Sequence, residues 1–532
     1  MYINNKMEII DYIVICASGK GTRLLPLTKH IPKLLVNVNN NCILYNIINY
    51  WKHYSYKYVI IIDREYNDIV SFYLNLIKTT CNIEYEILNI ECKNGEENSY
   101  TINKALVSDK YIDKKILITW CDIFPNSFIP SELFANNNII FTYKNYGRYD
   151  AYNNSIEKKM YGNIIGIYYF AKFNRLIHYE PQMDICDCYK SNFGDFITYE
   201  IQLLVDIGDN NKLYEYLNSN DIQYKTRYFN SIIETPENTL IKMSTCQYGD
   251  LIIKNEMLFY KYHNNNDTVK EVIPSIKQFN DNSFIMTKIN GNMMFNVFNN
   301  AKIPSQIILL KQIINTLNII HSAHTIEIDK EILINDINIE FYSKIFNRIE
   351  NIGLLLNNFT FIKRVNGIKI KYDHTYIINK LFARISKHYQ KNPSYCSIHG
   401  DPHMSNILCD SNNNLFFIDP RGYFGTTKIF GLKEYDYSKI TYSLSGFDEI
   451  NRNENHFFII NNDNIDVNIT NNMSSIHLNV FEEFNKNILI DMTILHWFGL
   501  TDYVKNNIHK CISAYYYGIY LYHLYYEKDK EL

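Results

Sequence analysis

The hydrophobic pattern of residues 10–125 alternates between two periods. Short runs of apolar and β-branched residues lie at 12–17, 58–62, 84–89 and 115–120. Segments with helical spacing lie between them, at 43–53, 67–78 and 99–107, and further strands are expected near 139–143, 163–170 and 199–205. Such apolar runs are typical of strands buried on both faces. The pattern predicts an α/β domain with a doubly wound, mixed sheet, whose ligands lie beyond the carboxyl ends of the strands.

The pattern changes after about residue 220. Short strands are expected at 238–244, 250–253 and 283–289, with a helix at 254–263. Beyond residue 303 the chain is mainly helical, as at 305–322 and 337–357, with a single clear hairpin at 406–419. The prediction is an N-terminal domain of residues 8–220, then a small strand-rich lobe of residues 235–303 and a larger helical lobe of residues 304–532.

Composition narrows the class of protein. A chain of 532 residues is too long for one hydrophobic core, and its net charge of −3 creates no global field for nucleic acid or an anionic membrane. Apolar stretches stay below the roughly 18 residues that span a bilayer, and the start lacks the features of a signal peptide. We expect a cytoplasmic protein with small-molecule substrates, no nucleic-acid partner and no membrane insertion. Its oligomeric state is left open.

The apolar run 12–17 leads directly into a loop that contains glycine. Glycines let backbone N–H groups turn toward an anion, and basic side chains add positive charge where a triphosphate would lie. The residues expected to bind the nucleotide are Gly19, Lys20, Gly21 and Thr22, and those expected to act on its phosphates are Arg23 and Lys33.

The string GxGTRLxPxT followed by PK resembles the sugar-nucleotide pyrophosphorylase and cytidylyltransferase superfamily, over roughly residues 8–215. The resemblance implies a Rossmann-like nucleotidyltransferase in which Mg²⁺, held by two aspartates, binds an NTP, with CTP or UTP expected. The phosphate of a small molecule then attacks the α-phosphorus and pyrophosphate leaves.

The same resemblance implies the metal ligands. Asp122 follows the run 115–120, and Asp206 lies in the segment VDIGD. Asp209 is close enough to serve instead, and Val205 stands where relatives often have an aromatic residue. Asn98 and Ser99 are expected to contact the nucleobase, and capping of the helix at 99–107 is an equal alternative for them.

A second motif lies at residues 398–422, IHGDPHMSNILCDSNNNLFFIDPRG. Asp401 and Asn406 have the spacing of the protein-kinase catalytic loop. The hairpin predicted at 406–419 would bring Asn406 and Asp419 side by side, where both can bind Mg²⁺. Asp401, on the adjoining loop, can accept or orient the proton of a substrate hydroxyl.

HGDxxxxN followed by ID resembles the aminoglycoside phosphotransferase and choline kinase superfamily, over about residues 235–445. The resemblance implies a two-lobed, kinase-like α+β domain that uses ATP. Lys242 would bind the ATP phosphates and Glu256 would orient it, with Lys254 as a competitor if the strand assignments slip. Arg421, in a DPRG variant similar to kinases found with polysaccharide-capsule genes, either touches an anionic substrate or forms a structural salt bridge.

Together the motifs predict a bifunctional enzyme, in which the kinase makes the phosphate that the nucleotidyltransferase activates for glycan or surface-precursor synthesis. The acceptor is either a sugar or polyol, or choline or another amino-alcohol. The tyrosines of residues 515–526 could form a cage for a quaternary ammonium group, although core packing explains them better. The alternative without catalytic activity is an inactive scaffold. It is disfavoured because the four metal and catalytic aspartates are all present.

Overall fold

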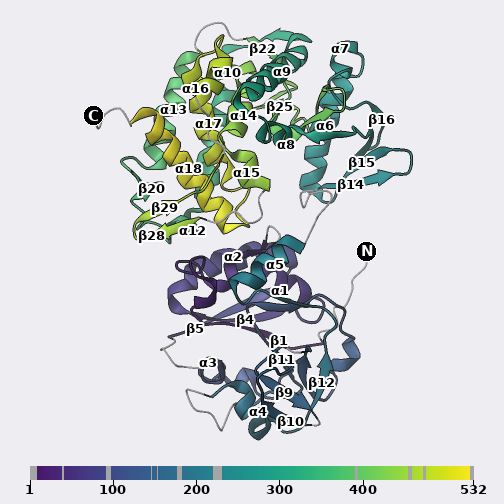
Figure 1. Cartoon of the computed structure of the whole chain (residues 1–532), viewed down its shortest axis with the longest axis vertical. Coiled ribbons are helices and arrows are strands. Elements are labelled where there is room, and N and C mark those ends of the chain that lie inside the picture. Colours follow the sequence, from purple (N-terminus) through teal and green to yellow (C-terminus); the bar gives the residue numbers. More distant parts are fainter. Residues whose placement is uncertain are drawn as a thin grey trace.

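The structure is a computed structural model with two parts. It describes residues 9–38, 41–91, 98–144, 146–152, 154–175, 183–219, 230–389, 394–452, 458–470 and 475–527. An N-terminal α/β domain and a larger C-terminal part lie one beyond the other along the longest axis of the molecule (Figure 1).

The N-terminal domain is a mixed α/β domain, as predicted. Its seven-stranded sheet has the order β12-β8-β11-β6-β1-β4-β5. The strands are β1 (Tyr12–Ala17), β4 (Lys57–Asp63), β5 (Glu84–Ile90), β6 (Ile116–Trp120), β8 (Asn138–Thr142), β11 (Ile164–Phe170) and β12 (Phe196–Glu200). β1 pairs in parallel with β4 and β6, whereas β11 runs antiparallel to β6 and β8.

Helices cover both faces of this sheet (Figure 1). They are α1 (Ile43–Trp51), α2 (Asn67–Cys81), α3 (Asn98–Ala105), α4 (Ile185–Phe193) and α5 (Asn210–Ser219). Ile13 and Ile15 of β1 pack in one core cluster with α1 and α2, while Val14 and Cys16 pack in another with α3 and α4. Successive strand residues point to opposite faces, so an uninterrupted apolar run is what a doubly covered strand requires.

One predicted strand is wrong in a way that shapes the site. The run 199–205 divides into β12, which ends at Glu200, and β13 (Leu204–Asp206). β13 leaves the main sheet and pairs antiparallel with β7 (Ile123–Pro125), so that Asp206 lies opposite Ile123. The hairpin β9 (Tyr149–Tyr152) and β10 (Ser155–Lys158) completes the domain.

The C-terminal part begins with a four-stranded antiparallel sheet in the order β14-β15-β17-β16. Its elements are β14 (Asn230–Thr235), β15 (Thr239–Ser244), α6 (Gln247–His263), α7 (Asp267–Lys270), β16 (Ile276–Phe279) and β17 (Ser283–Thr287). β14 was not predicted, and it precedes residue 235, where this lobe was expected to begin. Residues 220–229 lie outside the described residues.

The strand predicted at 250–253 is wrong, because these residues belong to α6. A four-residue apolar run fits a buried helix as well as a strand. The buried positions Ile253, Glu256, Met257 and Tyr260 follow helical spacing. Lys254 is exposed on the same helix.

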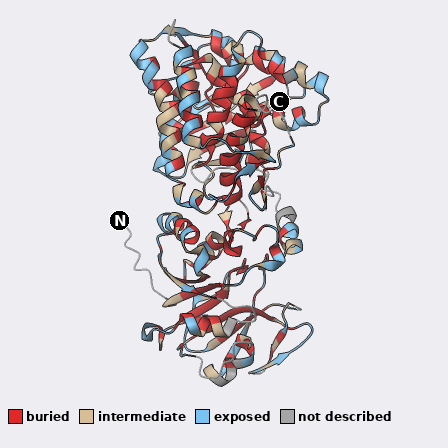
Figure 2. Ribbon diagram, turned by 90° about the vertical axis from the view of Figure 1, so that its left-hand side faces the viewer, coloured by how far each residue is buried: buried red, intermediate tan, exposed pale blue. Residues whose placement is uncertain are grey.

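The rest of the C-terminal part is mainly helical, and the buried residues concentrate there (Figure 2). Its longer helices are α9 (Ile303–Ser322), α10 (Lys330–Asn338), α13 (His374–His388), α14 (Lys433–Leu444), α17 (Lys486–Leu500) and α18 (Ile508–Tyr526). Its shorter helices are α8 (Met294–Asn299), α11 (Lys344–Glu350), α12 (Gly353–Asn357), α15 (Phe447–Arg452) and α16 (Ser475–Leu478). The helix predicted at 337–357 is wrong as one element, since a π-helical turn, Ile339–Ser343, separates α10 from α11 and a break at 351–352 separates α11 from α12.

The predicted hairpin is present as β23 (Ile407–Asp410) and β24 (Leu415–Phe417), and β18 (Gly291–Met293) extends it. It is not the single interruption that was expected. The other short strands are β19 (Thr325–Glu327), β20 (Arg364–Val365), β21 (Ile368–Lys369), β22 (Ser394–Ser397), β25 (Tyr423–Phe424), β26 (Thr427–Lys428), β27 (Phe430–Gly431), β28 (Ile459–Asn461) and β29 (Asn464–Asp466).

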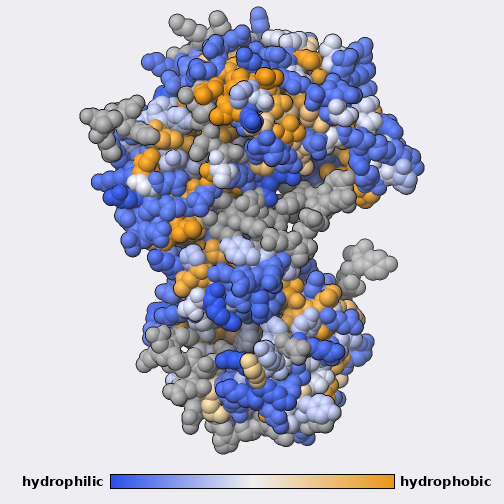
Figure 3. Space-filling view, in the orientation of Figure 1, coloured by the Kyte–Doolittle hydropathy of each residue, from blue (hydrophilic) through white to orange (hydrophobic). Residues whose placement is uncertain are grey.

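Among the described residues, one helix, α9, is long and apolar enough to cross a membrane by length and composition. Leu310, Ile313, Leu317 and Ile320 of α9 pack into a core cluster of the C-terminal part. A core helix of a globular protein meets the same two criteria. The face of the molecule seen in Figure 3 is largely hydrophilic, with hydrophobic atoms gathered mainly over the C-terminal part.

The two parts are joined by polar and apolar contacts. Asn37 bonds to both sides of the turn before α18: its amide donates to Asn506 O (3.3 Å) and its Oδ1 accepts from Ile508 N (3.2 Å). The Tyr73 hydroxyl of α2 donates to Lys505 O (2.9 Å). These residues sit beside a core cluster that contains side chains of both parts, so the parts share buried apolar surface.

We expect Asn37→Ala to lower the free energy of unfolding by about 1–3 kcal/mol, because the buried backbone N–H of Ile508 and the carbonyl of Asn506 lose their side-chain partner. Urea denaturation of the full chain measures this change. Asn49→Ala, at an exposed position of α1, is the control. Equal stability of the two variants would contradict the importance of this contact.

Candidate functional site

The glycine loop turns sharply and leaves its tip open. Gly21 adopts a left-handed conformation (φ 62°), and its carbonyl accepts a hydrogen bond from Thr28 Oγ1 at 2.7 Å. A Cβ at position 21 would lie 3.1 Å from Thr28 Cγ2, whereas one at Gly19 would meet nothing within 4 Å. Lys20 and Thr22 are exposed. The loop therefore has a rigid base and an accessible rim, as a phosphate-binding loop requires.

The two predicted metal ligands lie together at the end of the sheet. Asp122 follows β6 and Asp206 ends β13, and Ile207 N donates to Asp122 O at 3.0 Å. Their carboxylates converge on Gly208: a Cβ there would lie 2.9 Å from Asp206 Oδ1 and 3.1 Å from Asp122 Oδ2. The pairing of β7 with β13 thus brings together two residues that are 84 positions apart in the chain.

Basic side chains stand next to both carboxylates. Lys33 is buried, pairs with Asp122 and donates to Gly208 O at 3.2 Å. Arg23, which is exposed, lies 4.0 Å from Asp122 Oδ2. Lys212 of α5 pairs with Asp206. Positive charge therefore already surrounds the point where the acidic oxygens meet.

Sequence reasoning missed three residues of this site. Tyr146 donates its hydroxyl to Asp206 Oδ2 at 2.6 Å, and Lys212 and Gly208 complete the surroundings of the same carboxylate. Burial, and then the charge of Asp206, raise the pKa of Tyr146 far above its usual value, so it remains a neutral donor. Gly208 was visible in the DIG string, but nothing near Tyr146 in the sequence indicated that it reaches this site.

The residues present fit Mg²⁺. Carboxylate oxygens are its preferred protein ligands, and it commonly takes one or two of them while substrate phosphates and water complete the shell. Among the described residues, no three His, Cys, Asp or Glu side chains lie together in a way that could hold a metal ion, so the site is not an all-protein cage. Asp122 and Asp206 would hold the ion at Gly208.

Two other predictions concern the edges of this site. Asp209 Oδ1 accepts from Lys212 N at 3.0 Å at the start of α5, which gives it a capping role. Asn98 and Ser99 begin α3, but their side chains lie outside the described residues, and so does the preceding segment 92–97. Their contact with a nucleobase stays a prediction.

The C-terminal motif forms a second cluster of charges. Lys242 of β15 is buried and lies 2.8 Å from Glu256 Oε2 of α6 and 2.7 Å from Asp419 Oδ1. Burial alone would lower the pKa of Lys242, but the two carboxylates outweigh it and raise this pKa. Lys242, and not the exposed Lys254, is therefore the lysine that meets Glu256.

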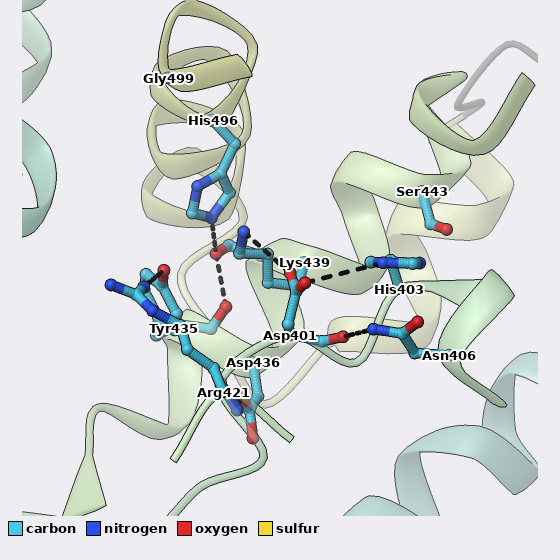
Figure 4. Close-up of polar contacts among 12 residues, drawn as sticks. Asp401, His403, Asn406, Arg421, Tyr435, Asp436, Lys439, Ser443, His496 and Gly499 are labelled. Atoms are coloured by element: carbon cyan, nitrogen blue, oxygen red, sulfur yellow. Dashed lines mark hydrogen bonds and ion pairs between the residues drawn. The ribbon is translucent and has the colours of Figure 1, made fainter. Parts of the chain in front are cut away.

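Donors from the loop at 398–406 and from α14 lie around Asp401 (Figure 4). Asp401 Oδ1 lies 3.1 Å from Lys439 Nζ, and its backbone carbonyl accepts from Asn406 Nδ2 at 3.0 Å. Ile418 N donates to Asn406 O at 2.9 Å, which brings the residue before Asp419 beside Asn406. The hairpin thus places Asn406 and Asp419 at the same end, with oxygen ligands suited to Mg²⁺.

The buried carboxylate of Asp436 holds the 398–406 loop in place. Asp436 accepts from His399 N (2.9 Å) and Gly400 N (2.7 Å) and also bonds to His321. His399 receives a hydrogen bond on Nδ1 from Asp401 N and donates through Nε2 to Ile418 O. Burial lowers the pKa of His399, so the neutral ring acts as a structural bridge between the loop and the hairpin.

Two further predictions concern residues that have structural partners, Arg421 and the tyrosines of α18. Arg421 donates from both terminal nitrogens of its guanidinium to Glu340, at 3.0 and 2.5 Å. This is the structural salt bridge, one of the two roles predicted for Arg421. Tyr515 and Tyr516 of α18 are buried, and their hydroxyls bond to His374 and Phe359 O. Tyr517 and Tyr522 are buried in the same core cluster, so these tyrosines serve packing.

Residues 12–126 match the model of the nucleotidyl transferase family. This range contains the glycine loop, Lys33 and Asp122, and it ends before Asp206 and before the whole C-terminal part. The C-terminal resemblance therefore stays a prediction. No curated protein matches the chain by sequence.

Several solved structures are similar to part of the chain. A putative glucose-1-phosphate thymidylyltransferase from Bacillus anthracis is 17% identical, with 40% of this chain and 97% of that chain covered and a TM-score of 0.34. A CTP:phosphocholine cytidylyltransferase from Streptococcus pneumoniae is 15% identical, with 40% and 99% covered and a TM-score of 0.31. A UDP-glucose pyrophosphorylase is 14% identical, with 40% and 98% covered and a TM-score of 0.32.

We expect Gly208→Ala to weaken Mg²⁺-dependent binding of CTP or UTP by about tenfold or more, or about 1.4 kcal/mol. Its Cβ would push apart the two carboxylates that must share one ion. Titration calorimetry measures the affinity, and Gly353→Ala, where a Cβ meets nothing within 4 Å, is the control. Unchanged affinity in Gly208→Ala would contradict the placement of the ion.

Proposed function

We propose that the N-terminal domain transfers a nucleotidyl group from an NTP, CTP or UTP first, to the phosphate of a small molecule such as a sugar phosphate or phosphocholine. The convergence of Asp122 and Asp206 on Gly208, beside the open glycine loop, carries this proposal. The family match over residues 12–126 supports the reaction class.

The proposed role of each residue follows from its charge. Backbone N–H groups of the Gly19–Thr22 loop bind the triphosphate, and Arg23 on its rim neutralises the pyrophosphate as it leaves. Lys33, buried between Asp122 and Gly208 O, holds a positive charge next to the α-phosphate. When bound, Mg²⁺ would screen the phosphates and orient the α-phosphorus for attack. The substrate's phosphate oxygen forms the new P–O bond in line as the bond to pyrophosphate breaks, and no covalent enzyme intermediate is needed.

The test is pyrophosphate release by the full chain with CTP, UTP, GTP and dTTP, each offered sugar 1-phosphates and phosphocholine. We expect one pair to react, and Asp122→Ala to reduce its rate at least about a hundredfold because the metal loses a ligand. Asp109→Ala removes an exposed carboxylate that pairs with Arg175 and serves as the control. Full activity in Asp122→Ala would refute the assignment, and silence across the panel would favour the inactive scaffold.

A second function is proposed for the C-terminal part, ATP-dependent phosphorylation of a hydroxyl group. The observation that favours it is Lys242, buried between Glu256 and Asp419. In this proposal Lys242 binds the ATP phosphates, Glu256 holds it in place, and Asn406 and Asp419 would hold Mg²⁺. Asp401 accepts the hydroxyl proton as the acceptor oxygen attacks the γ-phosphorus and ADP leaves.

We expect Lys242→Met to lower ADP release at least about a hundredfold, because the phosphates lose their buried cation. Lys254→Met, on exposed α6 surface, is the matched control. Since Lys242→Met leaves Glu256 buried without its partner, Asp401→Asn provides a second, milder variant with the same expected loss. Normal turnover in Asp401→Asn would refute the assignment.

The two functions would form a sequence on one chain. The C-terminal site makes a phosphate monoester and the N-terminal site joins that phosphate to a nucleotide, giving an activated precursor for glycan or surface synthesis in the cytoplasm. Choline or another amino-alcohol is the alternative to a sugar or polyol as the starting compound.

A further inference from the structure

A cavity of about 400 Å³ opens beside the proposed phosphotransferase loop. The π-helical turn Ile339–Ser343 and the start of α11 form one wall, and residues 421–425 form another. Arg421 N donates to His399 O at 2.8 Å, and a Cβ at Gly400 would lie 2.9 Å from Arg421 Cβ. The cavity wall is thus continuous with the loop that carries Asp401.

The lining of this cavity has an excess of positive charge. Lys344, Arg348 and Arg421 contribute three basic side chains, and Glu340 is the one carboxylate among the residues that line it. Glu340 is shared, since it binds Arg421 at 2.5 and 3.0 Å and Lys344 at 2.9 Å. Arg348 donates to Gly499 O, an uncharged partner. One carboxylate therefore faces three basic side chains.

The crowding of these basic groups destabilises the charged form of Lys344. Burial, followed by the charges of Arg421 and Arg348, lowers the pKa of Lys344 to about 7 against the opposing effect of Glu340. A bound anion would relieve the repulsion between these basic groups. Basic side chains that are held close together in this way favour the binding of an anion.

The geometry also suits recognition of a flat anionic group. The Arg421 guanidinium lies 3.9 Å over the Tyr423 ring and is fixed by Glu340 and Tyr435. A preorganised guanidinium binds carboxylate or phosphate oxygens with little further loss of freedom. Ser343 and Asn347 add neutral hydrogen-bonding groups for hydroxyls. π-Helical turns, such as the one that contributes Glu340 and Ser343, occur often at functional sites.

We propose that this cavity binds the hydroxyl acceptor of the phosphotransferase, and that the acceptor also bears an anionic group held by Lys344, Arg348 and Arg421. The proposal rests on the phosphotransferase function. It selects between the two acceptor classes, because the cavity repels choline and other cationic amino-alcohols. The γ-phosphoryl group passes from ATP to the acceptor oxygen, the hydroxyl proton passes to Asp401, and ADP is released.

Four compounds that share one sugar ring, with choline added as a cationic amino-alcohol, test the charge preference. ADP release by the full chain is measured with glucose (neutral), glucuronate (carboxylate), glucose 6-phosphate (phosphate), glucosamine (cationic) and choline. We expect kcat/KM for one of the two anionic sugars to exceed that for glucose by about tenfold or more. Which of the two is preferred tells a carboxylate from a phosphate. Preference for glucosamine or choline would overturn the proposal.

Variants separate binding from chemistry. Lys344→Gln should raise KM for the preferred acceptor about tenfold, with kcat and KM for ATP little changed, and Lys344→Arg should restore it. Lys330→Gln, at an exposed position of α10, is the control. An unchanged acceptor KM in Lys344→Gln would overturn the proposal.

Calorimetry decides the question if no compound stimulates ADP release. Glucuronate and glucose 6-phosphate are titrated into wild type and Lys344→Gln. If wild type binds a compound and the variant does not, the anionic site is supported even where the phosphotransferase proposal has failed. If wild type binds neither compound, the anionic site is refuted.

Discussion

Both candidate sites depend on a buried lysine that stands between oxygen acceptors. Lys33 lies between Asp122 and the carbonyl of Gly208, and Lys242 lies between Glu256 and Asp419. Carboxylates cannot be gathered in a poorly solvated place without compensating charge. The lysine provides that charge before any ligand arrives, and it is already positioned where phosphate oxygens would come. In each candidate site the lysine therefore offsets the repulsion between the oxygen acceptors around it.

The two parts are linked through the segment that follows the glycine loop. Lys29 donates to Ile460 O at 3.5 Å and the His30 ring lies 4.9 Å from Phe361, so residues between Arg23 and Lys33 contact the C-terminal part directly. Asn37 and Tyr73 extend this contact. A nucleotide-binding loop that is anchored at its far end on a neighbouring domain loses less freedom on binding. This gives a physical reason for the two proposed activities to share one chain.

The predictions failed where local pattern and long-range pairing compete. The apolar letters of 199–205 fit one strand, but β13 gains more by pairing with β7, and that departure is what carries Asp206 to Asp122. Residues 250–253 have a strand-like composition, yet they continue α6 and so place Glu256 against Lys242. The helix expected at 337–357 is broken by a π turn whose side chains line the cavity beside Asp401. Short apolar runs do not distinguish these outcomes, because the deciding contacts lie far away in sequence.

Sequence alone was enough for the alternation of strands and helices, the glycine loop, and the residue types of both motifs. These features depend on local backbone geometry and on spacing within a few residues, and both can be read directly from the sequence. Tertiary structure alone showed that Gly208 is the meeting point of Asp122 and Asp206, that Tyr146 and Lys212 join them, and that Lys344, Arg348 and Arg421 line one cavity. Each of these groups joins residues that are tens of positions apart in the chain. Charges at such separations become neighbours only when the packing of the sheet and helices brings them together, and no local pattern in the sequence encodes that distance.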